Sequence, residues 1–181
     1  MSYETIPLGN LATFESGGTP KKSNQSFWKG DIPWISAKTL VGDRVVASDL
    51  SITDEGLESG SRIAPSGSIL ILTRGSGLFK RIPIAIAGRD VAFNQDVKCV
   101  QSKREDIDNK YLFYALKAIE PEITAMLETT GIGAGKLSTD RLKALTIPIL
   151  DSESREKVVS VADALSGKIE LNNLLNGYLA V

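Results

Sequence analysis

The chain has 181 residues, enough for one domain or for one domain with an appendage. Hydrophobic residues make up 42% and charged residues 24%, which is typical of globular proteins and excludes a disordered chain. With no histidine and one cysteine, Cys99, it has no disulfide framework, Cys/His zinc site or imidazole chemistry. No apolar run approaches the roughly 20 residues that span a bilayer, and the N-terminal residues 1–4 lack the basic, then apolar pattern of a signal sequence. We therefore expect a cytoplasmic protein.

The charge of the chain is nearly balanced overall but unevenly distributed. The formal net charge is −1, yet residues 62–104 hold eight basic and two acidic groups, which leaves that segment at +6. Residues 43–60 and 105–156 carry an excess of acids. A basic middle between acidic flanks favours one anionic partner docked on one face. The alternative is that these charges are scattered over solvated faces.

The first 60 residues predict a loop-rich region with short elements. A short element is expected within residues 6–14, and the sequence GGTP at 17–20 is a strong turn signal. The apolar run 32–35 predicts a strand, and its proline favours the edge of a sheet. Trp28 and Trp34 are interpreted as anchors of the core or of loops rather than as stacking partners of bases.

From residue 61 the pattern changes to β structure. The continuous apolar run 69–73 has the length of a strand and is followed by glycines, and further strands are expected at 83–87 and 96–100. The last of these alternates with period two, so Val97 and Cys99 should share a face.

Helical spacing begins at Ile107. The sequence predicts a helix to Ile119 with an aspartate cap, and a second short helix from Pro121 to residue 127. A glycine-rich loop at 129–135, a capped helical turn and a last strand at 146–150 follow. The expected fold is α+β: a mixed, β-rich domain with short helices, followed by a long C-terminal helix.

The longest helical pattern covers residues 152–179, with Asp151 or Ser152 as its cap. At about 1.5 Å per residue this helix is about 40 Å long. Its apolar stripe consists of Val158, Val161, Leu165, Ile169, Asn172, Leu175 and Leu179, and Leu171, Leu174 and Tyr178 widen it. One interpretation is a helix that lies on its own domain. The favoured one is a helix that pairs with another helix, with Asn172 as the polar residue that sets the register.

Two segments of the sequence match nucleotide-binding motifs only in part, and no complete catalytic motif is present. Residues 130–137 resemble a P-loop, but Thr130 replaces the first glycine and Leu137 replaces the Ser/Thr that binds magnesium. Residues 75–80 lack the third glycine of a dinucleotide loop, and no serine triad forms without histidine. The sequence therefore predicts a binding module with no catalytic residues, no metal and no cofactor. The alternative is a small metal-dependent nuclease that uses Asp90, Gln101 and Lys103.

An ordered set of short motifs resembles a known family. The motifs are PLG at 7–9, GGTPK at 17–21, FWKGDIPWIS at 27–36, ITDEGLES at 52–59, the Asn94-Gln95 pair, and residues 142–150, which end in Ile147-Pro148-Ile149. In this order they resemble a target-recognition domain of the DNA-specificity subunit of Type I restriction–modification systems. The resemblance covers almost the whole chain.

The resemblance implies a division of the chain and a set of partners. Residues 1–150 are expected to be a DNA-binding target-recognition domain and 151–181 its helical spacer. The apolar stripe adds the expectation that this helix pairs with a second copy. Such subunits catalyse nothing; they read double-stranded DNA and hold methyltransferase and restriction subunits on it. Members of the family usually carry two recognition domains and two spacers, so this chain resembles a half-subunit or a fragment.

Two kinds of DNA contact are expected. The turn residues Thr19, Lys21, Lys22 and Ser23 suit phosphate oxygens, as do Lys136 and Arg141 beside the glycine-rich loop. The cations expected at strand ends, where loops enter a groove, are Arg74, Lys80, Arg81 and Arg89. An arginine matches guanine O6 and N7 with two bonds, and Asn94 or Gln95 matches adenine N6 and N7, although this pair is equally suited to cap a turn.

Overall fold

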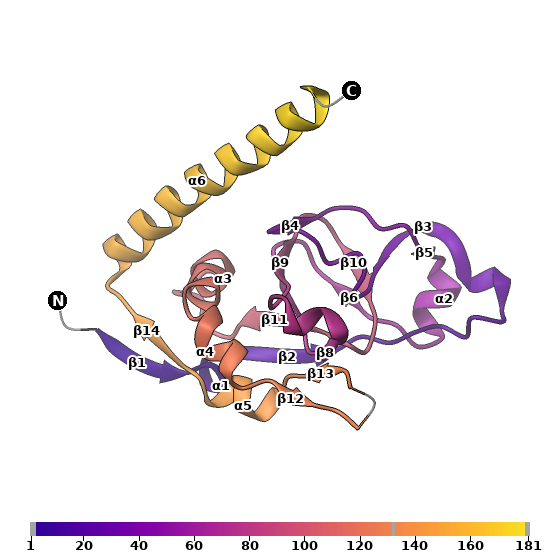
Figure 1. The fold of residues 1–181 in the computed structure, drawn as a ribbon, viewed down its shortest axis with the longest axis horizontal. Coiled ribbons are helices and arrows are strands. Elements are labelled where there is room, and N and C mark those ends of the chain that lie inside the picture. The colour runs from indigo at the N-terminus through magenta and orange to yellow at the C-terminus, as the bar shows by residue number, and fades with distance from the viewer. Residues whose placement is uncertain (1–2, 132, 180–181) are drawn as a thin grey trace.

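The structure is a computed structural model that describes residues 3–131 and 133–179, with side chains of the last helix described to residue 176. Figure 1 shows a β-rich body from which a long helix extends. The expected α+β architecture, with mixed sheets, short helices and a long C-terminal helix, is confirmed.

A five-stranded sheet forms the centre of the body. Its order is β2 (Ala12–Ser16), β11 (Val97–Ser102), β7 (Ile69–Leu72), β9 (Ile84–Ala87) and β4 (Arg44–Val45). The pairs are antiparallel except for β4 with β9. Every residue of β7 is buried, as expected for a strand covered on both faces. The predicted strands at 69–73, 83–87 and 96–100 are confirmed, and Val97 and Cys99 are both buried.

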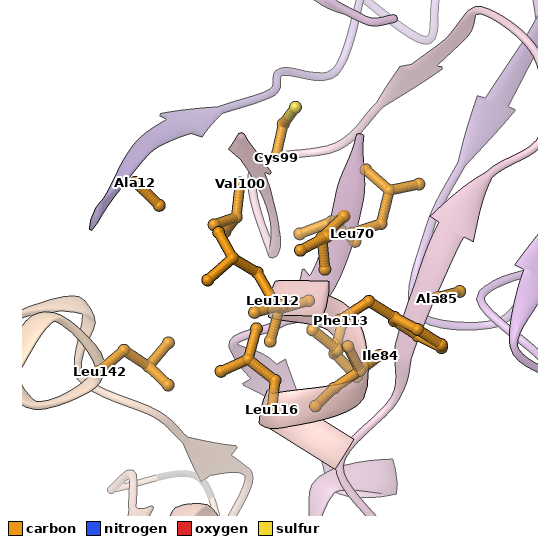
Figure 2. Close-up of a cluster of buried hydrophobic side chains, with 14 of the residues drawn as sticks. Ala12, Leu70, Ile84, Ala85, Cys99, Val100, Leu112, Phe113, Leu116 and Leu142 are labelled. Carbon is orange, nitrogen blue, oxygen red and sulfur yellow. The ribbon is translucent and has the colours of Figure 1, made fainter. Parts of the chain in front are cut away.

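Helix α3 (Asn109–Ala118) packs its apolar face on this sheet. Figure 2 shows Leu112 and Leu116 of the helix beside Leu70 of β7 and Val100 of β11, and all four are fully buried. The carboxylate of Asp108 caps the helix by accepting a hydrogen bond from a backbone N–H of its first turn, as predicted. The expected second short helix follows as α4 (Glu120–Ala125).

A second, four-stranded sheet contains the strand with Pro33, which the sequence predicted at the edge of a sheet. Its order is β5 (Ser51–Ile52), β3 (Trp28–Ile35), β10 (Val91–Phe93) and β6 (Ile63–Ala64), with η1 (Gln25–Phe27) and α2 (Asp54–Glu58) beside it. The strand that contains Pro33 is thus an inner strand, and the predicted edge position is wrong. The ladder to β10 begins at Trp34, one residue later, so the missing N–H of the proline breaks no bond of that ladder.

Two smaller sheets close the body. β1 (Glu4–Pro7) pairs with β14 (Thr146–Ile149), which brings the first strand beside the predicted last one. Residues 6–14 form the end of β1, the helical turn α1 (Leu8–Leu11) and the start of β2 rather than one element. The glycine-rich loop joins two short strands, in the sheet β12 (Glu128–Thr129), β13 (Gly135–Lys136) and β8 (Arg74–Gly75). The 3-10 helix η2 (Ser76–Phe79) follows β8, and α5 (Thr139–Ala144) follows β13.

The long helix α6 (Ser152–Leu179) matches the predicted range. The side chain of Asp151 caps it by accepting hydrogen bonds from the backbone N–H and the hydroxyl of Ser154, at 2.9 and 2.8 Å. Within the described part of the chain, no helix combines the length and the apolar character needed to cross a membrane.

Candidate nucleic-acid interface

The turn at residues 17–23 is held against the body by its glycines and by two tryptophans. A Cβ atom on Gly17 would lie 2.0 Å from the carbonyl oxygen of Phe93, so only glycine allows this approach. The indole N–H of Trp34 donates to the carbonyl oxygen of Gly18 at 3.0 Å, and Trp28 packs edge-on against Trp34 with ring centroids 5.3 Å apart. Both tryptophans therefore serve as anchors, as the sequence predicted.

This anchored turn is joined to the loop that follows β10. The hydroxyl of Thr19 donates a hydrogen bond to Oε1 of Gln95 at 2.6 Å. Lys21, Lys22 and Ser23 follow on the exposed part of the turn. Two groups of predicted DNA contacts that are 76 residues apart in the sequence thus lie together.

A polar pocket of about 430 Å³ lies next to Gln95, between β8, β11 and β13. It contains three predicted contacts, Arg74, Gln95 and Lys136, and Arg74 and Lys136 lie opposite each other in the β8–β13 ladder. The other lining residues are Thr73, Asp96, Lys98, Leu137, Ser138, Thr139 and Asp140. We call this the β8–β11–β13 pocket.

Lys98 is the cation that the sequence prediction missed. Its ammonium donates to the hydroxyl of Ser16, and burial, followed by the positive charges of Lys143 and Arg74, lowers its pKa. The signal was present in the alternation of β11, because Val97 and Cys99 point into the core and the residue between them points the other way.

The cations around the pocket differ in their acidic partners. Lys136 and Arg141 both lie near the carboxylate of Glu128, at 3.8 and 3.6 Å. Among the residues that the structure describes, no carboxylate oxygen lies within 4 Å of a side-chain nitrogen of Arg74 or Lys98. Of the three cations that line the pocket, Arg74 on β8 and Lys98 on β11 are therefore the two without an ion pair to a described residue, whereas Lys136 on β13 has one.

Asn94 has a different role from its neighbour Gln95. It is buried, with 7% of its surface exposed, and its Oδ1 accepts hydrogen bonds from the backbone N–H groups of Asp96 and Val97 at 3.1 and 3.2 Å. This is the turn-capping alternative that the sequence left open. Because the amide is committed to its own turn, this placement favours Gln95 over Asn94 as a reader of bases.

Three predicted cations lie outside the lining of the pocket. Lys80 and Arg81 are exposed directly after η2, which packs on β13. Arg89 follows β9, and the antiparallel pairing of β9 with β7 puts it at the opposite end of these strands from Arg74. The structure thus separates Arg89 from the group around Gln95.

Two of the three residues of the nuclease alternative, Asp90 and Lys103, form hydrogen bonds with backbone groups. The carboxylate of Asp90 accepts from the backbone N–H of Ser66 at 2.8 Å, and the ammonium of Lys103 donates to the carbonyl oxygen of Gly9 at 2.7 Å. In the described ranges, no group of three or more Asp, Glu, Cys or His side chains is placed to hold a metal ion. No observation favours a nuclease.

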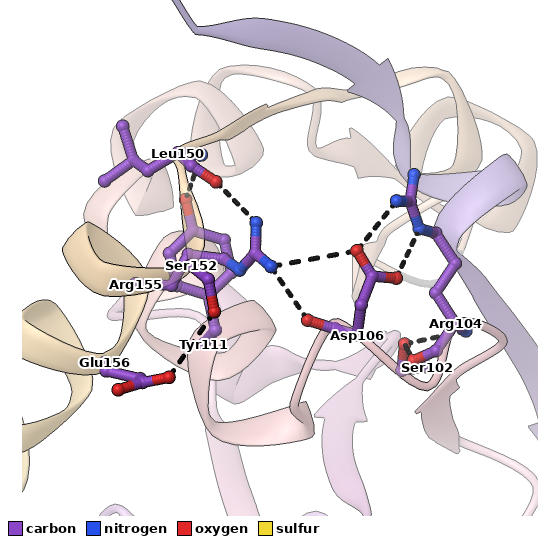
Figure 3. Close-up of polar contacts among 8 residues, drawn as sticks. All are labelled: Ser102, Arg104, Asp106, Tyr111, Leu150, Ser152, Arg155 and Glu156. Carbon is purple, nitrogen blue, oxygen red and sulfur yellow. Dashed lines mark hydrogen bonds and ion pairs between the residues drawn. The ribbon is translucent and has the colours of Figure 1, made fainter.

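Helix α6 is attached to the body near its start by polar contacts. The guanidinium of Arg155 donates to the carbonyl oxygens of Leu150 and Asp106 at 2.5 and 3.0 Å, as Figure 3 shows. The carboxylate of Asp106 also pairs with Arg104 at 2.8 Å, which holds its pKa below the ordinary range of an aspartate.

A second attachment lies two turns further along α6. The carboxylate of Asp163 accepts from Lys110 at 2.5 Å and from the hydroxyl of Tyr114 at 2.7 Å, both on α3. These two donors, the lysine first, lower the pKa of Asp163. Beyond this point the helix diverges from the body, and a cleft of about 780 Å³ lies between them.

The predicted stripe on α6 is not covered by the body. Its described members are exposed: Val158, Val161, Leu165, Ile169, Asn172 and Leu175, together with Leu171 and Leu174 from the second face. The side chains of Leu179 and Tyr178 lie outside the described ones. The interpretation of a helix that lies on its own domain is therefore wrong for this face, whereas its pairing with another helix remains a prediction.

Comparisons with known proteins agree with the resemblance. Residues 2–177 match the model of a family described as the type I restriction modification DNA specificity domain. The specificity subunit of the type I restriction enzyme EcoR124I/EcoR124II from Escherichia coli is 32% identical over 158 residues, which are 86% of this chain and 39% of that subunit.

Solved structures share the fold. A chain from a structure of the type I R-M system has a TM-score of 0.72 at 14% identity, over 98% of this chain and 41% of that one. The S subunit of a type I restriction-modification system from M. genitalium has a TM-score of 0.69 at 15% identity, over 94% and 40%. The chain spans about two fifths of the length of these relatives. Since the family model covers nearly the whole chain, the protein belongs to the type I restriction modification DNA specificity family.

Proposed function

We propose that this protein recognises a specific sequence in duplex DNA and catalyses no reaction itself. The observation that carries the proposal is that Arg74, Gln95 and Lys136 line one polar pocket and that Thr19 is hydrogen-bonded to Gln95. These four residues come from four separate segments of the chain. Cations position a protein on phosphates, and arginine and glutamine side chains read base edges. The family to which the chain belongs supports the same function.

We further propose that the chain is divided in two. Residues 1–150 form the recognition domain, and 151–181 form a helix for assembly. The exposed stripe of α6 pairs with the same helix of a second copy, antiparallel, so that the target is an interrupted palindrome with a spacer set by the helix length. Methyltransferase and restriction subunits are the further partners, by analogy with the E. coli relative, which is a subunit of a type I restriction enzyme.

Within the recognition domain, the side chains divide between bases and phosphates. Arg74 and Gln95 are assigned to base edges. Arg89 is the least favoured base contact, because it lies at the opposite end of β7 and β9 from Arg74. The phosphate contacts are Thr19, Lys21, Lys22, Ser23, Lys80, Arg81, Lys136 and Arg141.

The test is a selection of bound duplexes from a random pool, followed by binding titrations at several salt concentrations. Arg74→Ala is expected to change the preferred base at one position, because it removes a base contact. Lys22→Ala is expected to weaken binding to all sequences alike and to lower the salt slope by about one unit. If both variants act equally on all sequences, the assignment of bases and phosphates is wrong.

The absence of catalysis is tested separately. The protein is incubated with DNA and magnesium, and in a second reaction with DNA and a methyl donor. We expect unchanged DNA in both. Cleavage that Asp90→Ala abolishes would restore the nuclease alternative.

A further inference from the structure

The β8–β11–β13 pocket gathers cations on three adjacent segments of the body. Arg74 and Lys136 face each other across two short strands, and Lys98 lies on β11 beside them. The volume of about 430 Å³ is sufficient for a tetrahedral oxyanion with its water. We infer that this pocket binds a phosphate group of the DNA backbone with Lys98 as its central donor, an inference that rests on the proposed function.

The walls of the pocket are fixed by backbone hydrogen bonds. The N–H of Thr73 donates to the carbonyl oxygen of Asp96 at 2.7 Å, and the N–H of Leu137 donates to the carbonyl oxygen of Thr73 at 2.8 Å. These two bonds tie together the segments that carry Arg74, Lys98 and Lys136. A rigid frame lowers the ordering cost of binding, since the cations are already held near one another.

The electrostatics of the pocket favour an anion. Lys98 is half-buried and lies in the field of Lys143 and Arg74, so like charges repel one another there when the site is empty. Asp96 and Asp140 also line the pocket, but its three cations, Arg74, Lys98 and Lys136, outnumber these two carboxylates. A bound phosphate relieves the repulsion among the cations, whereas a neutral ligand leaves it in place.

A phosphate in this pocket explains how Gln95 reaches a base. Gln95 lines the same pocket, and its Oε1 is held by the hydroxyl of Thr19, so its position relative to a phosphate on Lys98 is defined. Phosphate contacts set the register in which base contacts are made. Lys98 is therefore a positioning contact for the base that Gln95 reads.

The experiment combines a protein variant with chemically modified DNA. The selected duplex is prepared with a neutral methylphosphonate at one backbone position at a time, and its affinity for the wild type and for Lys98→Met is measured. We expect Lys98→Met to weaken binding about tenfold or more and to lower the salt slope by about 0.9. At one backbone position, the methylphosphonate should weaken the wild type but not the variant.

Control variants separate this contact from general effects. Lys168→Met removes an exposed lysine of α6, outside the pocket, and should leave the methylphosphonate pattern unchanged. Lys98→Arg keeps the charge and should restore most of the affinity, which shows that the loss in Lys98→Met is not due to misfolding. Circular dichroism of each variant checks the fold.

The outcomes distinguish the failure of this inference from the failure of the proposed function. If the duplex binds but every methylphosphonate weakens Lys98→Met as much as the wild type, the phosphate site is wrong and DNA recognition stands. If the wild type selects no duplex, the proposed function fails and the inference falls with it. Binding of inorganic phosphate that requires Lys98, without DNA binding, would identify a free-anion site and would also overturn the inference.

Discussion

The central sheet and α6 use apolar residues in opposite ways. In β7 all four residues are buried within the body. In α6 the exposed fraction of the apolar stripe residues ranges from 40% at Val158 to 61% at Val161 and Ile169. Both segments are recognisable from their apolar spacing. The spacing of apolar residues therefore predicts a helix or strand and its apolar face, but whether that face is buried depends on what packs against it.

The largest effect is expected from the core side of this comparison. Leu112→Ala removes a fully buried side chain between α3 and the sheet, and should lower the free energy of unfolding by about 2–5 kcal/mol. Urea denaturation followed by circular dichroism measures the change. The matched control is Leu165→Ala on α6, at a concentration where the chain is monomeric, and it should change stability by about 0.5 kcal/mol or less. Equal losses for the two variants would contradict the contrast.

The exposed stripe gives the second prediction. Leu165→Glu and Leu175→Glu each place a charge on the face that we propose pairs with a second copy, and should convert a dimer to a monomer without unfolding the body. Light scattering at tens of micromolar measures the mass. Ser160→Glu, at an exposed position of α6 outside the stripe, is the control for an added acid on the helix. A wild type that is monomeric at this concentration would rule out self-pairing and leave another subunit as the partner of the helix.

The smallest effect is expected at the junction between the two regions. Asp163→Asn removes the charge that accepts from Lys110 and Tyr114, and should loosen α6 from α3 by at most about 1 kcal/mol, because the charged side chains are 38% and 48% exposed and water screens the pair. The distance between spin labels on α3 and α6 measures the change. The control is Lys157→Gln, which removes the ion pair with Glu153 inside α6 and leaves the junction with α3 intact.

The same junction should depend on pH. Lys110 and Tyr114 lower the pKa of Asp163 below its unfolded value of about 3.9, so their stabilisation is complete above that pH and is lost as the pH falls through the lower, folded pKa. The spin-label distance is therefore expected to broaden only below about pH 4. In Asp163→Asn this pH dependence should disappear, and broadening that persists in the variant would assign it to another group.

The sequence alone determined the elements whose signals are local. The helix at 152–179, the strand at 69–72 and the turn after Gly17 follow from apolar spacing, capping residues and glycines within a few positions of one another. The alternation of β11 also places Lys98 on the face opposite to the buried Val97 and Cys99. Counting the net charge of residues 62–104 as a whole did not show on which face of the strand this lysine lies.

Only the tertiary structure determines which distant segments of the chain lie next to each other. The bond between Thr19 and Gln95 joins residues 76 positions apart, and the pairing of Arg74 with Lys136 depends on how β8 meets β13. Pro33 is tolerated in the inner strand β3 because the pairing of β3 with β10 begins at Trp34, so the missing N–H of the proline breaks no bond to β10. No local pattern contains these relations, since they arise from the packing of segments that are distant in the chain, and the chemistry of the interface depends on them.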